Sequence, residues 1–148
     1  MELGDLAGLK SLAIEVGSVF RMTMYPEDKV TPKNEGDMSR DKYFVVIGKT
    51  EESVVVGSLL INTNINSRMF NLIASYQHCI SPASYSFLNG KERYISCYEI
   101  KMFPTERIIE KAEYIGILSQ EDIDASIELA KTSPINDRRT LKMLNLID

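Results

Sequence analysis

The sequence predicts a mainly β fold with a few helices, and three observations support this fold class. Several short runs are rich in valine, isoleucine and aromatic residues, and turn-forming residues separate them. A hydrophobic pattern of helical period follows the last of these runs. The 148 residues are enough for one core without a disulfide or metal. We therefore expect a small barrel or half-barrel with helices packed on it.

Composition and charge narrow the class of protein. Hydrophobic residues make up 44% and charged residues 26%, with a net charge of −4, which is typical of a globular domain. This balance argues against a protein coated in positive charge, although it leaves room for a local basic groove for RNA. The longest apolar stretch, 54–61, is far shorter than the roughly 20 residues that span a bilayer. No basic segment precedes an apolar run at the N-terminus. We expect a soluble, cytoplasmic protein without membrane contact.

The cysteines and the single histidine predict no metal site. Cys79, Cys97 and His78 have no ligand-pair spacing, so the expected metal is none. Both cysteines lie in apolar, strand-like segments and are expected to be reduced, buried thiols.

The first half of the chain is expected to hold one helix, three strands and a long loop. Apolar residues recur at helical spacing before Gly17, which is placed where helices commonly stop. The polar segment at 26–41 contains two prolines and is expected to be mobile and to lie beside the functional site. The predicted elements are helix 3–16, strand 19–25, loop 26–41, strands 43–47 and 53–63, and their hairpin turn 48–52.

The second half is expected to alternate short strands and helices. Ser119 is predicted to cap the longest helix, with Asp122 as a shorter substitute for the glutamate of a capping box. The predicted elements are strands 76–80, 93–103 and 114–118, a short helix at 105–112, a helix from Ser119 to Ser133-Pro134, and a terminal helix starting at Asp137. Arg107 is expected to hold the short helix against the sheet.

Four stretches follow one another in the order of a known family. They are GSVFR at 17–21, RDKYFVVI at 40–47, VVGSLLINT at 55–63, and YISCYEI at 94–100 with PTERII at 104–109 and IGILSQED at 115–122. This order resembles the PemK/MazF-like toxin family over about residues 17–132. The resemblance implies a small SH3-like β-barrel with its last helix, within a single domain 1–148 that has helical extensions at 1–16 and 133–148.

The resemblance also implies an activity. Members of this family are mostly endoribonucleases of toxin–antitoxin pairs, which act as dimers and are inhibited by an antitoxin protein. The implied reaction cleaves single-stranded RNA without metal or other cofactor, because the 2′-hydroxyl of the RNA attacks the adjacent phosphate. Such a reaction needs a cation near the phosphate and a group that moves a proton.

Arg40 and Thr63 match the catalytic positions of the family. The family has Arg-Pro where this sequence has Arg40-Asp41-Lys42, so a small shift would give the cationic role to Lys42. Asn62 competes with Thr63 in the same way, and His78 is a further candidate for contact with substrate or proton transfer. Each candidate also has a non-functional interpretation. Arg40 could be an exposed side chain paired with Asp37 or Asp41. Asn62 and Thr63 could satisfy a turn at the end of a strand, and His78 could have a structural role.

A second function class stays open at this point. The acidic balance and the altered Arg-Pro motif favour a non-catalytic relative that binds a protein or nucleic-acid partner. In either class we expect a homodimer, because the family implies it and because 54–61 is apolar on both strand faces. The terminal helices are the alternative cover for the second face.

Overall fold

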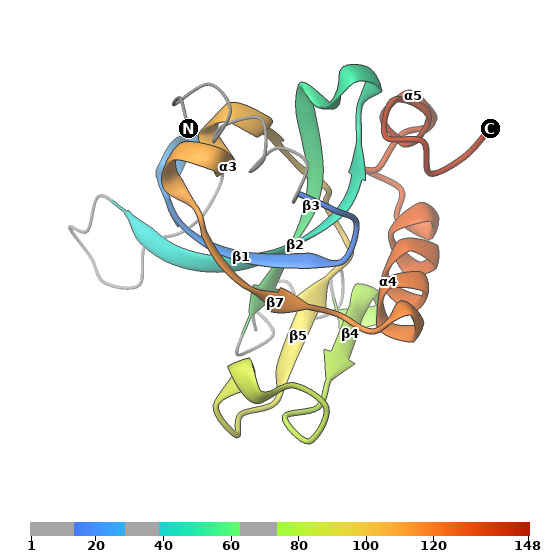
Figure 1. The fold of residues 1–148 in the computed structure, drawn as a ribbon. Helices are drawn as coiled ribbons and strands as arrows, with labels where there is room; N and C mark the ends of the chain where they lie inside the picture. The colour runs from blue at the N-terminus through green and yellow to red at the C-terminus, as the bar shows by residue number, and fades with distance from the viewer. Residues whose placement is uncertain (1–13, 29–38, 63–73) are drawn as a thin grey trace.

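The computed structural model describes residues 14–28, 39–62 and 74–148, and they form a mainly β fold with helices (Figure 1). Within these ranges, three α-helices accompany seven strands, which form one antiparallel sheet. The strands are β1 (Ser18–Met24), β2 (Arg40–Lys49), β3 (Val55–Asn62), β4 (Gln77–Ile80), β5 (Arg93–Ser96), β6 (Lys101–Pro104) and β7 (Glu113–Ile117). The helices are α3 (Thr105–Lys111), α4 (Gln120–Thr132) and α5 (Arg138–Met143).

The sheet is open in the described part of the chain. Its strand order is β4-β5-β3-β2-β1-β7, and β6 also pairs with β3. No ladder joins the end strands β4 and β7 among these residues. The predictions of strands at 19–25, 43–47, 76–80 and 114–118, of a hairpin between β2 and β3, and of three helices in the second half are confirmed.

The prediction of one continuous strand at 93–103 is wrong. β5 pairs with the end of β3, β6 pairs with its start, and residues 97–100 leave the sheet between them. In this gap the Cys97 N–H donates to the Tyr76 carbonyl at 2.8 Å, and the Ile100 N–H donates to Asn136 Oδ1 at 2.9 Å. The buried Asn136 side chain follows α4 in sequence, so partners distant along the chain replace the ladder bonds.

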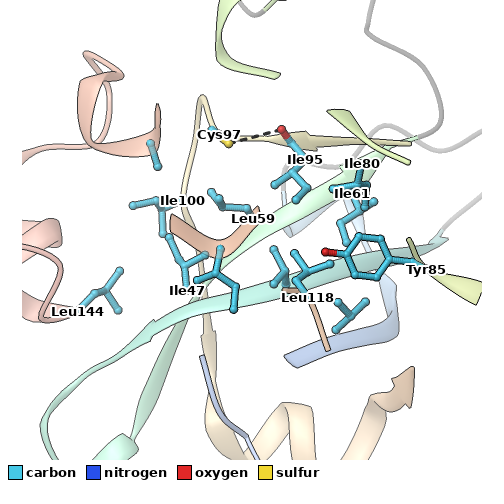
Figure 2. Packing of buried hydrophobic residues seen from close by; sticks show 14 of the residues in the cluster. Ile47, Leu59, Ile61, Ile80, Tyr85, Ile95, Cys97, Ile100, Leu118 and Leu144 are labelled. Atoms are coloured by element: carbon cyan, nitrogen blue, oxygen red, sulfur yellow. Dashed lines mark hydrogen bonds between the residues drawn. The ribbon is translucent and has the colours of Figure 1, made fainter. Parts of the chain in front are cut away.

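Both faces of the sheet are covered within one chain. Val45 and Ile47 of β2 belong to the larger core cluster, with α4 and α5, whereas Phe44 and Val46 belong to a second cluster with α3. This alternation follows from the two-residue period of a strand. In Figure 1, α3 lies on the opposite side of the sheet from α4 and α5. Figure 2 shows the packing of the larger cluster. The two-sided apolar pattern at 54–61 is covered within the chain from Val56 to Ile61, whereas Val54 is exposed. The homodimer stays a prediction from the resemblance alone.

The chain after α5 packs closely against the hairpin of β2 and β3. Asp137 caps α5 by accepting from the Thr140 N–H at 2.8 Å, as the terminal-helix prediction requires. A Cβ atom at Gly48 would lie 2.6 Å from the Leu144 carbonyl oxygen, so only glycine allows this approach. Asn145 Nδ2 donates to the Lys49 carbonyl at 3.1 Å.

The predicted loop 26–41 is shorter at both ends than expected. Residues 26–28 form a 3-10 turn, η1 (Pro26–Asp28), and Arg40 and Asp41 are already part of β2, because they pair with Met24 and Thr23 of β1. The predicted helix at 3–16 lies almost wholly, and the rest of the loop at 29–38 entirely, outside the described residues. Among the helices that are described, none is long and apolar enough to cross a membrane.

Candidate functional site

A basic site forms where β2 begins and β3 ends. Tyr43 pairs with Ile61 in the register, which places Lys42 beside Asn62 on the neighbouring strand. The Lys42 side chain is only 7% exposed, and its Nζ donates a hydrogen bond to Asn62 Oδ1. Arg40 lies two residues earlier on β2 and therefore on the same face. The structure thus brings Arg40, Lys42 and Asn62 together, as three of the predicted site residues.

The surroundings of Lys42 make its proton unusually easy to remove. Burial is the main cause that lowers the pKa of Lys42, and the positive charges of Arg40 and Arg93 add to it, giving a value of about 8. Loss of water around an ammonium disfavours its charged form, and like charges act in the same direction. A lysine with this pKa can exchange a proton near neutral pH.

Arg93 at the start of β5 is the site residue that sequence reasoning missed. Its guanidinium lies 5.1 Å from the centre of the Tyr43 ring, in a cation–π contact on the face of β2 opposite Lys42. Its positive charge nevertheless acts on Lys42. Its buried Nε has no hydrogen-bond partner in the described structure. Only the pairing of β5 with β3 places Arg93 near β2, so no local pattern could have revealed this position. We call Arg40, Lys42 and Arg93 the cationic cluster.

The cationic cluster has no carboxylate partner within the described ranges. The non-functional interpretation offers Asp41 or Asp37 as the partner of Arg40, and Asp41 is bonded elsewhere. The Asp41 carboxylate instead accepts from Arg21 at 2.8 Å and from Thr23 Oγ1 at 2.7 Å, because neighbouring residues of a strand point to opposite faces. Asp37 and Thr63 lie outside the described residues, so the predicted roles of both stay untested.

His78 is separate from the cationic cluster. It lies on β4 and pairs in register with Ile95 of β5, so two strands separate it from β2. His78 Nε2 lies 2.8 Å from Asp122 Oδ1, at the first turn of α4. The position of His78 fits a structural role, in which this side chain links the last strand of the sheet to α4.

Asp122 is the centre of a polar network that closes the start of α4. Ser119 Oγ accepts from the Asp122 N–H at 3.2 Å, which confirms the predicted cap. The reciprocal half of the capping box differs from the prediction. The Asp122 carboxylate accepts from the Tyr85 hydroxyl, and that hydroxyl accepts from the Ser119 N–H at 2.9 Å. Tyr85 therefore replaces the acid that would usually close the box.

The network favours the ionised form of Asp122. Burial by itself raises the pKa of Asp122, but hydrogen bonds from Tyr85 and His78 outweigh it and hold the pKa below its usual 3.8. An aspartate with a lowered pKa in the folded protein stabilises that state above its unfolded pKa, and the benefit is lost as pH falls through the folded pKa.

We expect Asp122→Asn to lower the free energy of unfolding at neutral pH by about 1–3 kcal/mol, since two hydrogen bonds lose their charged acceptor. The difference from the unsubstituted protein should shrink as pH falls below the usual pKa of 3.8, where the native carboxylate also takes up a proton. Urea unfolding at several pH values measures this. Asp124→Asn, on an exposed carboxylate of the same helix, is the matched control. Equal losses for both variants at every pH would contradict the assignment.

The two cysteines differ in exposure. Cys97 is buried, and burial raises the pKa of its thiol to about 12. The prediction for Cys79 is wrong, because this thiol is exposed. β4 is the last strand at one end of the sheet, and Cys79 points to the face opposite His78, where the described residues leave it uncovered.

Arg107 pairs with Asp28 through two hydrogen bonds of 2.8 Å and so links α3 to the turn after β1.

Comparisons with known proteins assign no family to the chain. No protein-family model matches the sequence, and no curated protein matches it. Within the described ranges, no group of three or more histidine, cysteine, aspartate or glutamate side chains is placed to hold a metal ion.

Proposed function

We propose that this chain is a PemK/MazF-like, toxin-type endoribonuclease that cleaves single-stranded RNA without metal and is inhibited by an antitoxin protein. The observation that supports this most directly is the cationic cluster, in which Arg40, Lys42 and Arg93 come from two strands and have no carboxylate partner in the described structure. A phosphodiester supplies the negative charge that such a cluster lacks.

Each basic side chain has a distinct part in the proposed reaction. Arg40 holds the phosphate and balances the charge that builds on it, because a guanidinium binds phosphate oxygens through two N–H groups. Arg93 adds positive charge near Lys42. With a pKa of about 8, Lys42 is neutral in about a tenth of molecules at pH 7. Neutral Lys42 accepts the proton of the 2′-hydroxyl as its oxygen attacks phosphorus. The bond to the 5′ oxygen then breaks, and protonated Lys42 or water returns a proton to that oxygen.

Thr63 and Asn62 complete the proposed site. Thr63 keeps the second catalytic role that the resemblance implies. Asn62 fixes the position of the Lys42 ammonium through its Oδ1 atom and is well placed to bind substrate beside it.

The proposal includes the SH3-like barrel type, over about residues 17–132. Side chains bring the two ends of the open sheet together, which supports this type. The Tyr85 hydroxyl, from the segment after β4, lies 3.0 Å from Ser119 Oγ, just after β7. The Phe87 ring lies so close to Gly116 of β7 that a Cβ there would be 2.9 Å from it. The homodimer and the cytoplasmic location belong to the same proposal.

One observation favours the second candidate function, a non-catalytic binding protein of the same type. Lys42 is buried and already bonded to Asn62, so the two groups nearest the proposed substrate satisfy each other. A binding protein would use the cationic cluster to hold an anionic partner without moving a proton.

Incubation with a long single-stranded RNA in the presence of EDTA tests both functions. The enzyme predicts fragments with 2′,3′-cyclic phosphate ends, and Arg40→Ala should remove them. Arg139→Ala, an equal charge change on the exposed face of α5, should cleave normally. Intact RNA that the protein still retains on a filter, with retention lost in Arg40→Ala, would support the binding protein. Intact RNA without retention would overturn the enzyme and an RNA-binding role for the second candidate.

A further inference from the structure

A β-bulge in β7 exposes two large apolar side chains on the same face of the sheet. Ser18 pairs with Ile117 and Phe20 pairs with Tyr114, and the register shifts between these pairs. Ser18 and Phe20 are two residues apart on β1 and so point to the same face of the sheet. Their partners Ile117 and Tyr114 therefore share that face, although they are three positions apart in β7, because the bulge adds one residue. Tyr114 is 57% exposed and Ile117 is 53% exposed.

The same strand has an open edge. β7 is the last strand in the strand order, so in the described structure only β1 pairs with it. The Phe87 ring packs where a side chain at Gly116 would point, on the face of β7 opposite Ile117, so it does not cover Ile117. An edge of this kind offers unpaired N–H and C=O groups to an added strand. Figure 1 shows β7 leading from α3 to α4, and it pairs antiparallel alongside β1.

The charges around this surface are mainly acidic. Its basic residues are the exposed Lys111 and Arg21, which lies opposite Glu113 and pairs with Asp41. Glu113 opens β7, Glu110 precedes it on α3, and Glu121 follows on the first turn of α4; all three are exposed. These carboxylates take part in none of the salt bridges found among the described residues. We call Tyr114 and Ile117, with these three glutamates, the β7 surface.

We propose that the β7 surface binds an extended segment of a partner protein that carries alternating apolar and basic side chains. The apolar side chains would cover Tyr114 and Ile117, and the basic ones would meet the glutamates. Charge decides between the possible occupants. A second copy of this chain would bring two sets of glutamates together, and RNA or an anionic membrane would be repelled. The β7 surface is distinct from the cationic cluster, so this inference does not depend on RNA cleavage.

Fluorescence anisotropy with a labelled octapeptide of alternating lysine and valine tests the proposal on the full chain. We expect binding of this peptide, and at least about tenfold weaker binding in Ile117→Lys. Val54→Lys is the matched control, because Val54 is 62% exposed beside the distant hairpin turn and its change should not alter affinity. Glutamate–valine peptide should not bind. Hydrogen exchange should show slower exchange of β7 amides only with the lysine–valine peptide.

Two results would overturn the proposal. One is equal loss of affinity in Ile117→Lys and Val54→Lys, which would mean that general charge attraction holds the peptide. The other is absence of peptide binding. If light scattering then shows a dimer that Ile117→Lys dissociates, the occupant of the β7 surface is a second copy of the chain. Tyr114→Lys is a weaker test, because the Tyr114 ring also contacts the Phe20 ring, with centroids 5.7 Å apart.

Discussion

Replacing Lys42 with methionine should reduce RNA cleavage by about 10²–10³-fold, the largest functional effect expected from any single substitution in this protein. Methionine keeps the length and apolar body of the side chain but removes the amine that accepts and returns a proton in the proposed reaction. Arg40 and Arg93 would remain, so RNA binding should weaken far less than cleavage. Single-turnover cleavage and filter binding, measured side by side, separate the two effects.

Lys49→Met is the matched control, because Lys49 ends the same strand outside the cationic cluster. It should leave cleavage unchanged. Cleavage by Lys42→Met at the rate of the unsubstituted protein would remove Lys42 from the mechanism and leave Arg40 and Thr63 as the candidates.

The same substitution has a stability effect of predictable sign. The folded protein lowers the pKa of Lys42 from 10.5 to about 8, so between these values the unfolded chain binds more protons than the folded one. Raising the pH through this window therefore stabilises the native protein relative to Lys42→Met. Below pH 8 the buried ammonium is a cost that methionine removes. A lysine that destabilises the fold where it is charged is typical of a residue kept for function.

Replacing Phe44 with alanine should cause the largest loss of stability, about 3–5 kcal/mol in the free energy of unfolding. Phe44 is fully buried, and its ring packs between Phe20 and Phe103, with centroid distances of 5.8 and 5.4 Å. Removing it leaves a cavity in the second core cluster, which contains residues of β1, β2, β3, β6 and α3. Urea denaturation at neutral pH, followed by circular dichroism, measures the change.

Val54→Ala provides the comparison for this measurement. Val54 is 62% exposed, so its truncation should change stability by no more than about 0.5 kcal/mol. A Phe44→Ala variant as stable as Val54→Ala would show that the second cluster contributes little to folding and that the larger cluster alone holds the sheet together.

Much of the fold could be predicted from local pattern. The runs at 19–25, 43–47 and 114–118 are strands because β-branched and aromatic residues dominate them. Ser119 and Asp137 start helices because their side-chain oxygens satisfy the first free N–H groups. Lys42 and Asn62 become site candidates through the family resemblance, as the neighbours of the matched positions Arg40 and Thr63.

The sequence by itself determined most of the strand and helix positions in the described ranges, since hydrophobic period and capping residues act over a few positions. Only the tertiary structure decided which of those segments meet. The residues at 93–103 form two strands because Asn136, far along the chain, accepts the Ile100 N–H. Arg93 joins Lys42, and Tyr85 replaces the expected capping acid, through contacts between segments distant in sequence. Such contacts depend on strand register and side-chain packing, which no local pattern encodes.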